Sequence, residues 1–483
     1  MANINKKVFV SSAAWKMVES LSTRGVSLLI SILLARLLLP EDYGIVALTA
    51  IFINLSSSLV ASGLGTALVR KEDVDNVDYT TVFIFCMIVA AVLYVVCFFA
   101  APFIADFYEE PMIKPVLRVQ MLSLFLCALG VVRGAMITRQ FQFKAQFITN
   151  FIATVIGGVT GIVMAYAGLG VWALVFYTLI QSGSYSFILF FFVKWKPSKE
   201  LSFKRMKSLL SFSSFVLFAG VLDFLGNNIP GTVYGKHYSV EVLGYTSKGG
   251  QLPELICLHT FGAISGVLLP AMAETQSDLP RLKAMTRKIA SMSAFILIPM
   301  MIGLAFVGER TIIFLFTEKW LPAAPFLITS CIYYLMNPFR SINMQLIYAL
   351  GDSKKATMVE IIRFCLLMAN MLLGVFVFRF SLITVSYISS GVAIVVVLIT
   401  QAIVKRYIGY SYREWFSDIA APLMMSVAMA AVVYLVGLLQ MSNLLVLILQ
   451  VATGVVVYFT LAVITKNPCL AEALGILKGM IKR

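Results

Sequence analysis

Long apolar runs separated by short polar connections make up almost the whole chain. An apolar segment of about 20 residues is long enough to cross the hydrocarbon core of a bilayer as a helix. By that measure the pattern predicts fourteen membrane-spanning helices, at residues 11–39, 44–69, 79–103, 112–137, 146–167, 169–193, 208–232, 242–270, 289–308, 321–349, 356–378, 381–404, 417–438 and 443–465. The longest hydrophilic stretch between them is Lys194–Lys207, so no folded soluble domain is expected outside the membrane.

The composition excludes a soluble globular protein. Of the 483 residues, 60% are hydrophobic and 13% are charged, whereas soluble domains carry about 25% charged residues. A chain of this length has too few charges to cover its own surface, so the bilayer must solvate most of it. We therefore expect an all-α, polytopic membrane protein.

The net charge of +15 is compatible with nucleic acid, anionic lipid or an anionic substrate, and its position along the chain separates these possibilities. Of the 38 Lys and Arg residues, 26 lie in connections or at span ends on the side of the N-terminus, six lie in such places on the opposite side, and six lie deeper within the spans. Because basic connections stay cytoplasmic, this bias predicts that both termini are inside. Most of the charge thus sets the topology, and no nucleic-acid partner is expected.

An internal repeat runs through the first twelve spans. Pro115 and Arg133 in the fourth span are 18 residues apart, and Pro322 and Arg340 in the tenth span have the same spacing at an offset of 207. At an offset of 200, Tyr43-Gly44 before the second span corresponds to Gly244-Tyr245 at the start of the eighth. Transporters built from such parallel repeats bind substrate between the two lobes and rock one lobe against the other.

The repeat predicts the domain organisation. Residues 1–200 form an N-lobe of spans 1–6, and residues 201–410 form a C-lobe of spans 7–12. Residues 411–483 hold spans 13 and 14 and a cytoplasmic tail, outside the repeat. The predicted fold is thus two pseudo-symmetric six-helix bundles with two additional C-terminal helices.

Ten charged residues lie inside the spans, where each charge costs roughly 2.5–3.5 kcal/mol on insertion scales and usually faces a wet cavity or an opposite charge. The six cations are Lys16, Arg24, Arg118, Lys248, Arg340 and Arg363. The four carboxylates are Glu19, Asp223, Glu254 and Glu360. The excess of cations favours an anionic substrate such as a phosphate or pyrophosphate, and the carboxylates are candidates for binding a coupling H⁺ or Na⁺.

Simpler explanations exist for several of these residues. Lys16 with Glu19, and Glu360 with Arg363, have the i,i+3 spacing of a structural ion pair. Arg133 and Arg340 lie near the ends of their spans, so their side chains could extend to the cytoplasmic lipid headgroups. Arg24 has no acidic residue three or four positions away, which makes it the stronger substrate-binding candidate.

Two further patterns concern the cavity. Polar residues follow one face of the first span, and Asn54 begins a similar polar stripe with Ser57, Ser58 and Ser62 in the second span. Such stripes either line water or pack helices together.

The run from Lys248 to Glu254 contains Gly249, Gly250 and Pro253, which should break or kink the helix and expose backbone donors.

The cysteines and histidines indicate neither a metal site nor a cofactor site. The seven cysteines form no CxxC pair, and the two histidines, His237 and His259, have no ligand-like neighbours. Small apolar packing is the favoured interpretation of these cysteines. We expect no resident cofactor, and coupling to H⁺ or Na⁺ stays open.

Three segments resemble the polysaccharide transporter (Wzx-type) flippases of the multidrug/oligosaccharidyl-lipid/polysaccharide exporter superfamily. They are Leu34 to Gly44 continuing to Gly63–Arg70, Leu243-Gly244-Tyr245 leading to Leu268–Ala273, and Glu318-Lys319-Trp320 through Ala349–Asp352. The resemblance covers about residues 10–410. It implies two six-helix bundles around a cavity, alternating access, and translocation of undecaprenyl-pyrophosphate-linked oligosaccharide across the bacterial inner membrane.

The resemblance also bears on the site and the partners. It implies that cavity cations hold the pyrophosphate, and Arg24 is the position that carries over best. Lys16, Lys248, Arg340, Arg363, Arg118 and Asn54 are candidates from the pattern of this sequence alone. The implied partners are the lipid-linked glycan and membrane lipids, with a glycan polymerase and a chain-length regulator as further candidates.

Three alternatives remain. A lipid II flippase or a multidrug antiporter of the same superfamily would have the same fold, although an antiporter for cationic drugs should have an anionic cavity. A polytopic glycan polymerase or ligase would need a sizeable outer loop with catalytic groups, and the longest outside segment is about residues 102–112. We therefore expect a transporter and not an enzyme.

Overall fold

The computed structural model describes residues 6–61, 64–71, 73–140, 142–207, 228 and 231–472, without the side chains of residues 6–21, 66, 70, 262–267 and 270. The described chain is helical and contains no strand, which confirms the predicted all-α class. Its internal contacts divide it into two compact units, Met1–Gly244 and Tyr245–Arg483. We refer to them as unit 1 and unit 2.

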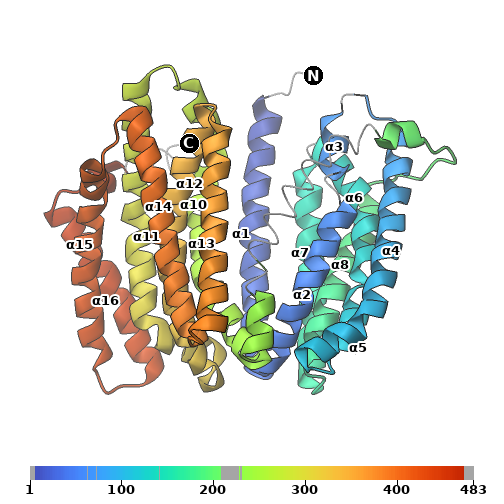
Figure 1. Ribbon diagram of the computed structural model, residues 1–483, viewed down its shortest axis with the longest axis horizontal. Helices are drawn as coiled ribbons and strands as arrows, with labels where there is room; N and C mark the ends of the chain where they lie inside the picture. The colour runs from blue at the N-terminus through green and yellow to red at the C-terminus, as the bar shows by residue number, and fades with distance from the viewer. Residues whose placement is uncertain are drawn as a thin grey trace. The chain divides into compact units, whose positions relative to one another are not determined.

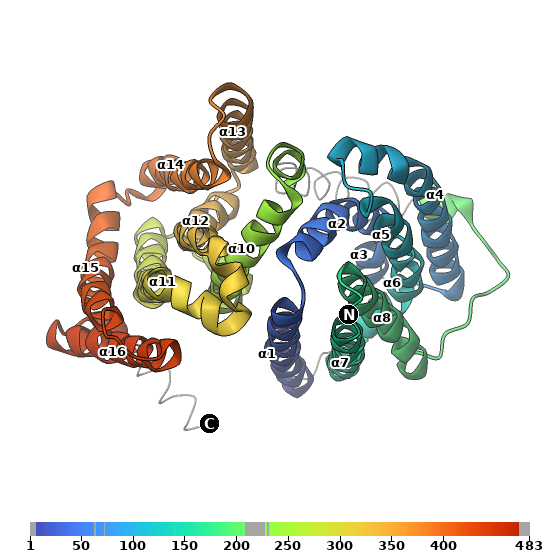
Figure 2. The same cartoon turned by 90° about the horizontal axis from the view of Figure 1, so that it is seen from below.

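Long helices that run side by side form unit 1 (Figure 1). They are α1 (Lys6–Leu37), α2 (Pro40–Ala61), α3 (Leu64–Arg70), α4 (Asn76–Tyr108), α5 (Ile113–Gln120), α6 (Ser123–Arg139), α7 (Phe143–Tyr166) and α8 (Val171–Phe192). The view along the helices shows α2, α5, α6 and α8 grouped together, with α4 beside them (Figure 2). Leu117, Leu124 and Val132 lie in their shared core and are fully buried.

Unit 2 has the same kind of construction. It contains most of α10 (Val240–Glu274), then α11 (Leu279–Phe316), η1 (Glu318–Ala323), α12 (Ala324–Ala349), α13 (Ser353–Leu372), η2 (Leu373–Val377), α14 (Leu382–Ile408), α15 (Tyr412–Gly437) and α16 (Asn443–Ile464). The last two helices, α15 and α16, both pack on α11 (Figure 2). A core of Phe295, Met429 and Tyr458 joins these three helices.

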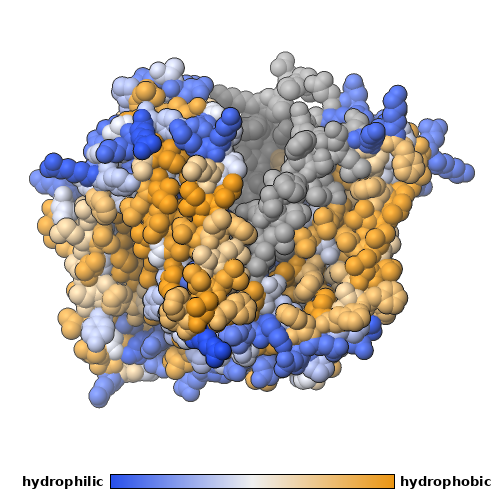
Figure 3. Space-filling model, viewed as in Figure 1, coloured by the Kyte–Doolittle hydropathy of each residue, from blue (hydrophilic) through white to orange (hydrophobic). Residues whose placement is uncertain are grey.

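Ten of the described helices are long and apolar enough to cross a membrane. In each unit, apolar side chains cover the middle of the helices and polar side chains gather at both ends (Figure 3). Helices also occupy the predicted spans at 11–39, 242–270 and 321–349, as α1, α10 and α12. The predicted seventh span, 208–232, lies almost wholly outside the described residues, so the count of fourteen stays a prediction.

Helix ends follow local sequence rules. Asp75 caps α4 by accepting a hydrogen bond from the backbone N–H of Asp78, and the Asp78 carboxylate in turn accepts one from the backbone N–H of Asp75. Ser411 and Glu414 form the same reciprocal box at the start of α15. Because the first N–H groups of a helix have no partner inside it, such caps fix where each long helix starts.

The repeat predicted from Pro115 and Pro322 has a local structural counterpart. Pro115 lies in the short helix α5, which a turn at Met121 separates from α6. Pro322 lies in the short 3₁₀ helix η1, which leads directly into α12. In both copies a short proline-containing segment therefore precedes the long helix that carries Arg133 or Arg340.

The repeat-related glycines Gly44 and Gly244 lie at a close approach of backbones within unit 1. A Cβ atom at Gly44 would lie 1.8 Å from the carbonyl oxygen of Val240, and one at Gly244 would lie 2.1 Å from that of Pro40. Real side chains cannot adopt such distances. Glycine at both positions thus lets the first turn of α10 touch the first turn of α2.

The predicted break in the helix after Lys248 is wrong. Helix α10 continues without interruption from Val240 to Glu274, although Pro253 has no N–H to donate to the carbonyl oxygen of Gly249. A Cβ atom at Gly249 would lie 2.7 Å from the carbonyl oxygen of Ala323 and 2.8 Å from Cβ of Phe326. The glycine instead allows α10 to pack closely against η1 and α12, as small residues do in membrane helix pairs.

Candidate functional site

Unit 1 contains a cavity of about 640 Å³ among α2, α5, α6, α7 and α8. Among the residues that the structure describes, its lining is uncharged, and its polar groups are amides and hydroxyls: Asn54, Ser57, Gln120, Ser123, Asn150, Thr178, Gln181, Ser182, Tyr185 and Ser186. Apolar residues such as Val46 and Leu126 fill the rest of the wall. Neutral donors and acceptors beside apolar patches suit a ligand that presents many hydroxyl groups.

Hydrogen bonds between helices hold several of these groups in place. The Thr49 hydroxyl donates to Oε1 of Gln120 at 2.7 Å, and Nε2 of Gln181 donates to the Thr154 hydroxyl at 2.9 Å. The Ser123 hydroxyl is buried at the cavity wall without a hydrogen-bond partner. The cavity therefore offers fixed polar groups together with unused hydrogen-bonding capacity.

Unit 2 contains a charged cluster instead of a neutral cavity. The guanidinium of Arg340 on α12 pairs with Oε1 of Glu360 on α13, and Nε of Arg363 lies 2.7 Å from Oε2 of the same carboxylate. The three side chains are 28%, 33% and 14% exposed, respectively. These three described side chains, two guanidiniums and one carboxylate, together carry one positive charge. Such a site favours an anion that can accept paired N–H donors.

Neutral polar groups extend this cluster. Nη2 of Arg340 donates to Oδ1 of Asn337 at 3.4 Å, and Asn337 also contacts the Cys257 thiol on α10. On the same two helices, the Tyr334 hydroxyl hydrogen-bonds the exposed Glu254. The polar side of α10, α12 and α13 thus includes two of the predicted carboxylates, Glu254 and Glu360.

Lys248 lies in a different setting. Its side chain is 4% exposed, its Nζ donates to Oε1 of Gln251 at 3.1 Å, and the same atom lies 5.4 Å from the centre of the Phe316 ring. Gly249, the next residue along α10, packs closely against η1 and α12, so the neighbouring helix also encloses Lys248. Among the described contacts, none joins Lys248 to the cluster of Arg340, Glu360 and Arg363.

The structure also places the predicted residues of unit 1. Arg24 is an exposed side chain on α1, and Asn54 is exposed and lines the neutral cavity. Arg118 donates from Nε to the carbonyl oxygen of Phe98 at 3.2 Å, and its guanidinium lies 3.9 Å from the centre of that ring. Lys16 and Glu19 lie on α1, but their side chains are outside the described part, as is the whole of Asp223.

The sequence analysis missed most of the cavity wall. Gln120, Asn150 and Gln181 are single amides within apolar spans, and they come together only through the packing of α5, α7 and α8. A search for isolated amides at membrane depth would have selected them as well as Asn54. Attention to charge alone could not find a site built from neutral groups.

Unit 2 also has an apolar groove of about 680 Å³ between α11, α15 and α16. Pro299, Gly303, Met429, Val433 and Gly454 are among the residues that line it. The last two helices, α15 and α16, lie outside the sequence repeat. They form one wall of this groove.

Bundles of membrane-spanning helices with polar groups gathered in their interior are typical of transporters. Residues 33–325 match the polysaccharide biosynthesis protein family, and because the match covers more than half of the chain, the protein belongs to this family. The resemblance to polysaccharide transporters is therefore confirmed.

Two relatives give the family match more detail. The chain is 23% identical to the teichuronic acid biosynthesis protein TuaB of Bacillus subtilis over 475 residues, which cover 96% of each chain. It is also 23% identical to the succinoglycan biosynthesis transport protein ExoT of Rhizobium meliloti over 324 residues, covering 67% of this chain and 66% of ExoT.

The fold is similar to that of the lipid II flippase MurJ in its inward closed conformation. The TM-score is 0.74 at 16% sequence identity, and the similarity covers 94% of this chain and 99% of MurJ. This similarity confirms the predicted flippase-like membrane fold. At this level of identity it concerns the fold and not the substrate.

Proposed function

We propose that this protein is a flippase that moves undecaprenyl-pyrophosphate-linked oligosaccharide repeat units across the bacterial inner membrane by alternating access. The family match, the relatives in polysaccharide biosynthesis and the flippase-like fold support this function. The units transported would be precursors of O-antigen, capsule or exopolysaccharide. The protein would act as a transporter and perform no covalent chemistry.

The cluster of Arg340, Glu360 and Arg363 is the observation that carries the proposal. A pyrophosphate presents several oxygens to guanidinium N–H donors, and the excess positive charge of the cluster would favour it over a neutral headgroup. Arg24, exposed on α1, is the further pyrophosphate contact that the family resemblance implies. Lys16, Lys248 and Arg118 complete the proposed set of cations.

The neutral cavity of unit 1 is a suitable site for part of the glycan. Its amides and hydroxyls, including Asn54 and Gln181, match the hydroxyl groups of sugars, and its volume of about 640 Å³ accommodates a small part of an oligosaccharide. The apolar groove beside α15 and α16 could hold a segment of the polyprenyl tail, because it is lined almost entirely by hydrocarbon. Each chemical part of the substrate thus has a matching surface.

The orientation, domain arrangement and energy coupling belong to the same proposal. The positive-inside bias supports a cytoplasmic position for both termini, and the proposed lobes are residues 1–200 and 201–410, followed by 411–483. Glu19, Asp223, Glu254 and Glu360 are candidates for an H⁺ or Na⁺ site, because carboxylates at membrane depth often have such a role. A glycan polymerase and a chain-length regulator would act on the exported units and are the proposed protein partners.

Complementation of defined flippase-null bacterial strains tests the function. We expect restored surface glycan in a strain lacking a lipid-linked oligosaccharide flippase, and no rescue of a strain depleted of its lipid II flippase. Arg24→Ala should abolish the restored display at unchanged protein abundance in the membrane, whereas Arg24→Lys should retain part of it. Rescue of the lipid II strain alone would refute the proposed substrate, and full display with Arg24→Ala would refute the role of Arg24.

A further inference from the structure

A second pocket of unit 1, of about 900 Å³, lies at one end of its spans and apart from the residues that line the neutral cavity. Helix α4 begins at this pocket, α8 ends there, and α6 contributes two side chains. Its walls are Val74, Asp75, Asn76, Tyr79, Arg133, Met136, Phe190 and residues 193–197.

Arg133 is a buried cation in the wall of this pocket. The residue is 3% exposed, and its guanidinium lies 3.5 Å from the centre of the Phe190 ring and 5.4 Å from that of Trp195. Nη1 donates to the carbonyl oxygen of Leu129 at 3.3 Å, and Nη2 donates to that of Trp195 at 3.5 Å. Both hydrogen bonds are long, since such contacts usually measure about 2.9–3.0 Å.

The positive charge of Arg133 is therefore incompletely compensated. Its Nε is buried without a hydrogen-bond partner, and among the described residues no carboxylate lies within ion-pairing distance of it. A buried charge without a counter-charge is costly, and in a native structure it commonly marks an anion that the polypeptide does not itself provide.

The remaining charges of the pocket also favour an anion. Lys194 and Lys196 are exposed at its rim. The negative charge of the Asp75 carboxylate is already balanced, because the carboxylate pairs with Arg205 and accepts a hydrogen bond from the backbone N–H of Asp78 at 2.9 Å. These partners lower the pKa of Asp75 to about 2. The carboxylate thus stays ionised and paired, and the three cations are left available to a ligand.

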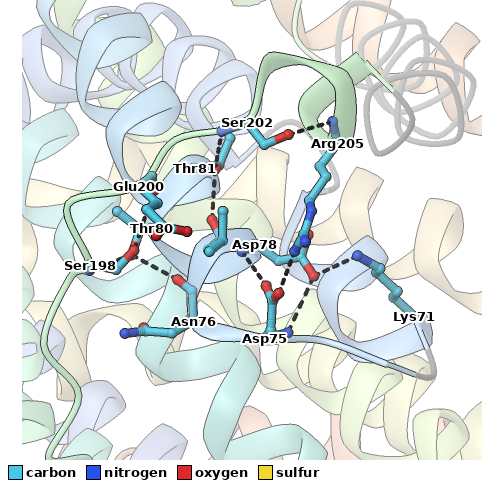
Figure 4. Close-up of polar contacts among 11 residues, drawn as sticks. Lys71, Asp75, Asn76, Asp78, Thr80, Thr81, Ser198, Glu200, Ser202 and Arg205 are labelled. Carbon is cyan, nitrogen blue, oxygen red and sulfur yellow. Dashed lines mark hydrogen bonds and ion pairs between the residues drawn. The ribbon is translucent and has the colours of Figure 1, made fainter.

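The wall of the pocket is fixed to α4 by hydrogen bonds. Nε1 of Trp195 donates to Oδ1 of Asn76 at 2.6 Å, and Nδ2 of Asn76 donates to the carbonyl oxygen of Lys196 at 3.3 Å. The following residues are tied to the same helix, where the backbone N–H of Ser198 donates to the Thr80 hydroxyl at 2.8 Å (Figure 4). The pocket is therefore formed before any ligand binds.

The surroundings identify the kind of anion. Phe187, Phe191 and Phe192 on the last turns of α8 are 64%, 68% and 40% exposed, so hydrocarbon-facing surface adjoins the pocket. The pocket itself lies where the span ends, at the depth of the headgroups. Indole rings such as that of Trp195 favour this depth, and basic pockets between transmembrane helices bind anionic headgroups.

We propose that this pocket binds the phosphate headgroup of an anionic glycerophospholipid, with Arg133 as the buried anion contact and Lys194 and Lys196 at the rim. The acyl chains of the lipid would lie along the exposed phenylalanines of α8. The site is separate from the flippase substrate site, and its test does not depend on transport.

Binding of phosphatidylglycerol to the purified full-length protein in detergent tests the proposal, with native mass spectrometry as the readout. The wild type should bind phosphatidylglycerol at least tenfold more tightly than phosphatidylcholine, which has the same phosphate but no net charge. Arg133→Met should abolish this preference, because a hydrogen bond to a charged group contributes about 1.5–3 kcal/mol, roughly a tenfold change or more. Inorganic phosphate in the same assay distinguishes a free ion from a headgroup.

Arg139→Met is the matched control, since Arg139 lies on the same helix but donates to the carbonyl oxygen of Leu68 outside the pocket. It should keep the preference within about twofold. A second variant, Lys194→Gln with Lys196→Gln, retains Arg133 and should weaken binding about thirtyfold, given roughly 1 kcal/mol for each of the two basic residues near the surface. This variant keeps the proposal testable if Arg133→Met does not fold.

Three results would overturn the proposal. The first is that Arg133→Met binds phosphatidylglycerol as tightly as the wild type does. If Arg133→Met does not fold, the same result with the double lysine variant has the same meaning. Another is an equal loss with Arg139→Met, which would indicate unspecific surface attraction. The third is binding of inorganic phosphate as tight as that of phosphatidylglycerol, which would assign the pocket to a soluble anion.

Discussion

The candidate sites of the two units are built from different kinds of polar residue. In unit 1, a cavity is lined by neutral amides and hydroxyls held by hydrogen bonds such as Gln181 to Thr154. In unit 2, partly buried side chains of α12 and α13 form a charged cluster, in which Arg340 and Arg363 share Glu360. The repeat-related arginines differ in the same way, since Arg133 stacks on aromatic rings and Arg340 pairs with a carboxylate. A repeated fold can thus offer one surface for hydroxyl groups and another for an anion.

Removal of both guanidiniums of the unit 2 cluster should have the largest effect. Arg340→Gln with Arg363→Gln leaves Glu360 without a partner and changes the local charge from positive to negative. Two charge-assisted contacts are each worth about 1.5–3 kcal/mol, so flipping of lipid-linked oligosaccharide in liposomes should fall by more than about a hundredfold. Arg310→Gln with Arg379→Gln removes the same charge elsewhere in unit 2 and should have little effect. Similar flipping by both double variants would show that the cluster is not the anion site.

Filling the apolar groove should have a smaller but clear effect. Gly303 lines the groove, and a Cβ atom there would meet Cε of Met429 at 3.5 Å, an ordinary contact distance. Gly303→Ala should therefore be tolerated, whereas Gly303→Leu should occupy the groove and reduce flipping about tenfold, since a displaced tail segment loses about 0.8 kcal/mol for each buried CH₂. Val456→Leu on the exposed side of α16 is the control. A full rate with Gly303→Leu would exclude the groove from transport.

The neutral cavity of unit 1 predicts a loss that depends on the sugar. Asn54→Ala should weaken binding of lipid-linked oligosaccharide about fivefold, because a neutral hydrogen bond is worth about 1 kcal/mol. Binding of the sugar-free polyprenyl pyrophosphate should not change, and the effect should not vary with salt. Ser58→Ala, one turn along α2 and outside the cavity lining, is the control. An equal loss for both lipids would contradict a glycan role for this cavity.

The smallest expected effect concerns the ion pair between Asp75 and Arg205, which stabilises the structure of unit 1 where α4 begins. The pKa of Asp75 is lowered to about 2 by Arg205, from an ordinary value near 3.8, so the ion pair stabilises the folded protein above about pH 4 and is lost as the pH falls toward 2. Amide exchange of Ser198 and Ser202, corrected for its intrinsic pH dependence, should rise over that range. In Asp75→Asn it should be raised already at pH 7. A pH-independent exchange in the wild type would show that the pair does not hold this segment.

Much of the architecture followed from the sequence, because apolar runs respond directly to their solvent. Helices occupy every predicted span within the described residues, and the short proline segments around Pro115 and Pro322 recur as α5 and η1. The break predicted at Gly249 failed because a glycine in a membrane helix has two uses, flexibility and close packing. Only the neighbouring backbone at Ala323 shows which use applies.

The sequence by itself determined that this chain is a helical membrane protein with an excess of cations at membrane depth, since hydropathy and charge are properties of each segment alone. The tertiary structure decided what each polar group does. It joined Arg340 to Glu360 across two helices, enclosed Lys248, and gathered Gln120, Asn150 and Gln181 around one cavity. Within the described part of the chain, it left Arg133 against aromatic rings and without a carboxylate. The physical reason is that partners at these distances depend on how helices pack against each other, and the spacing within one helix does not contain that information.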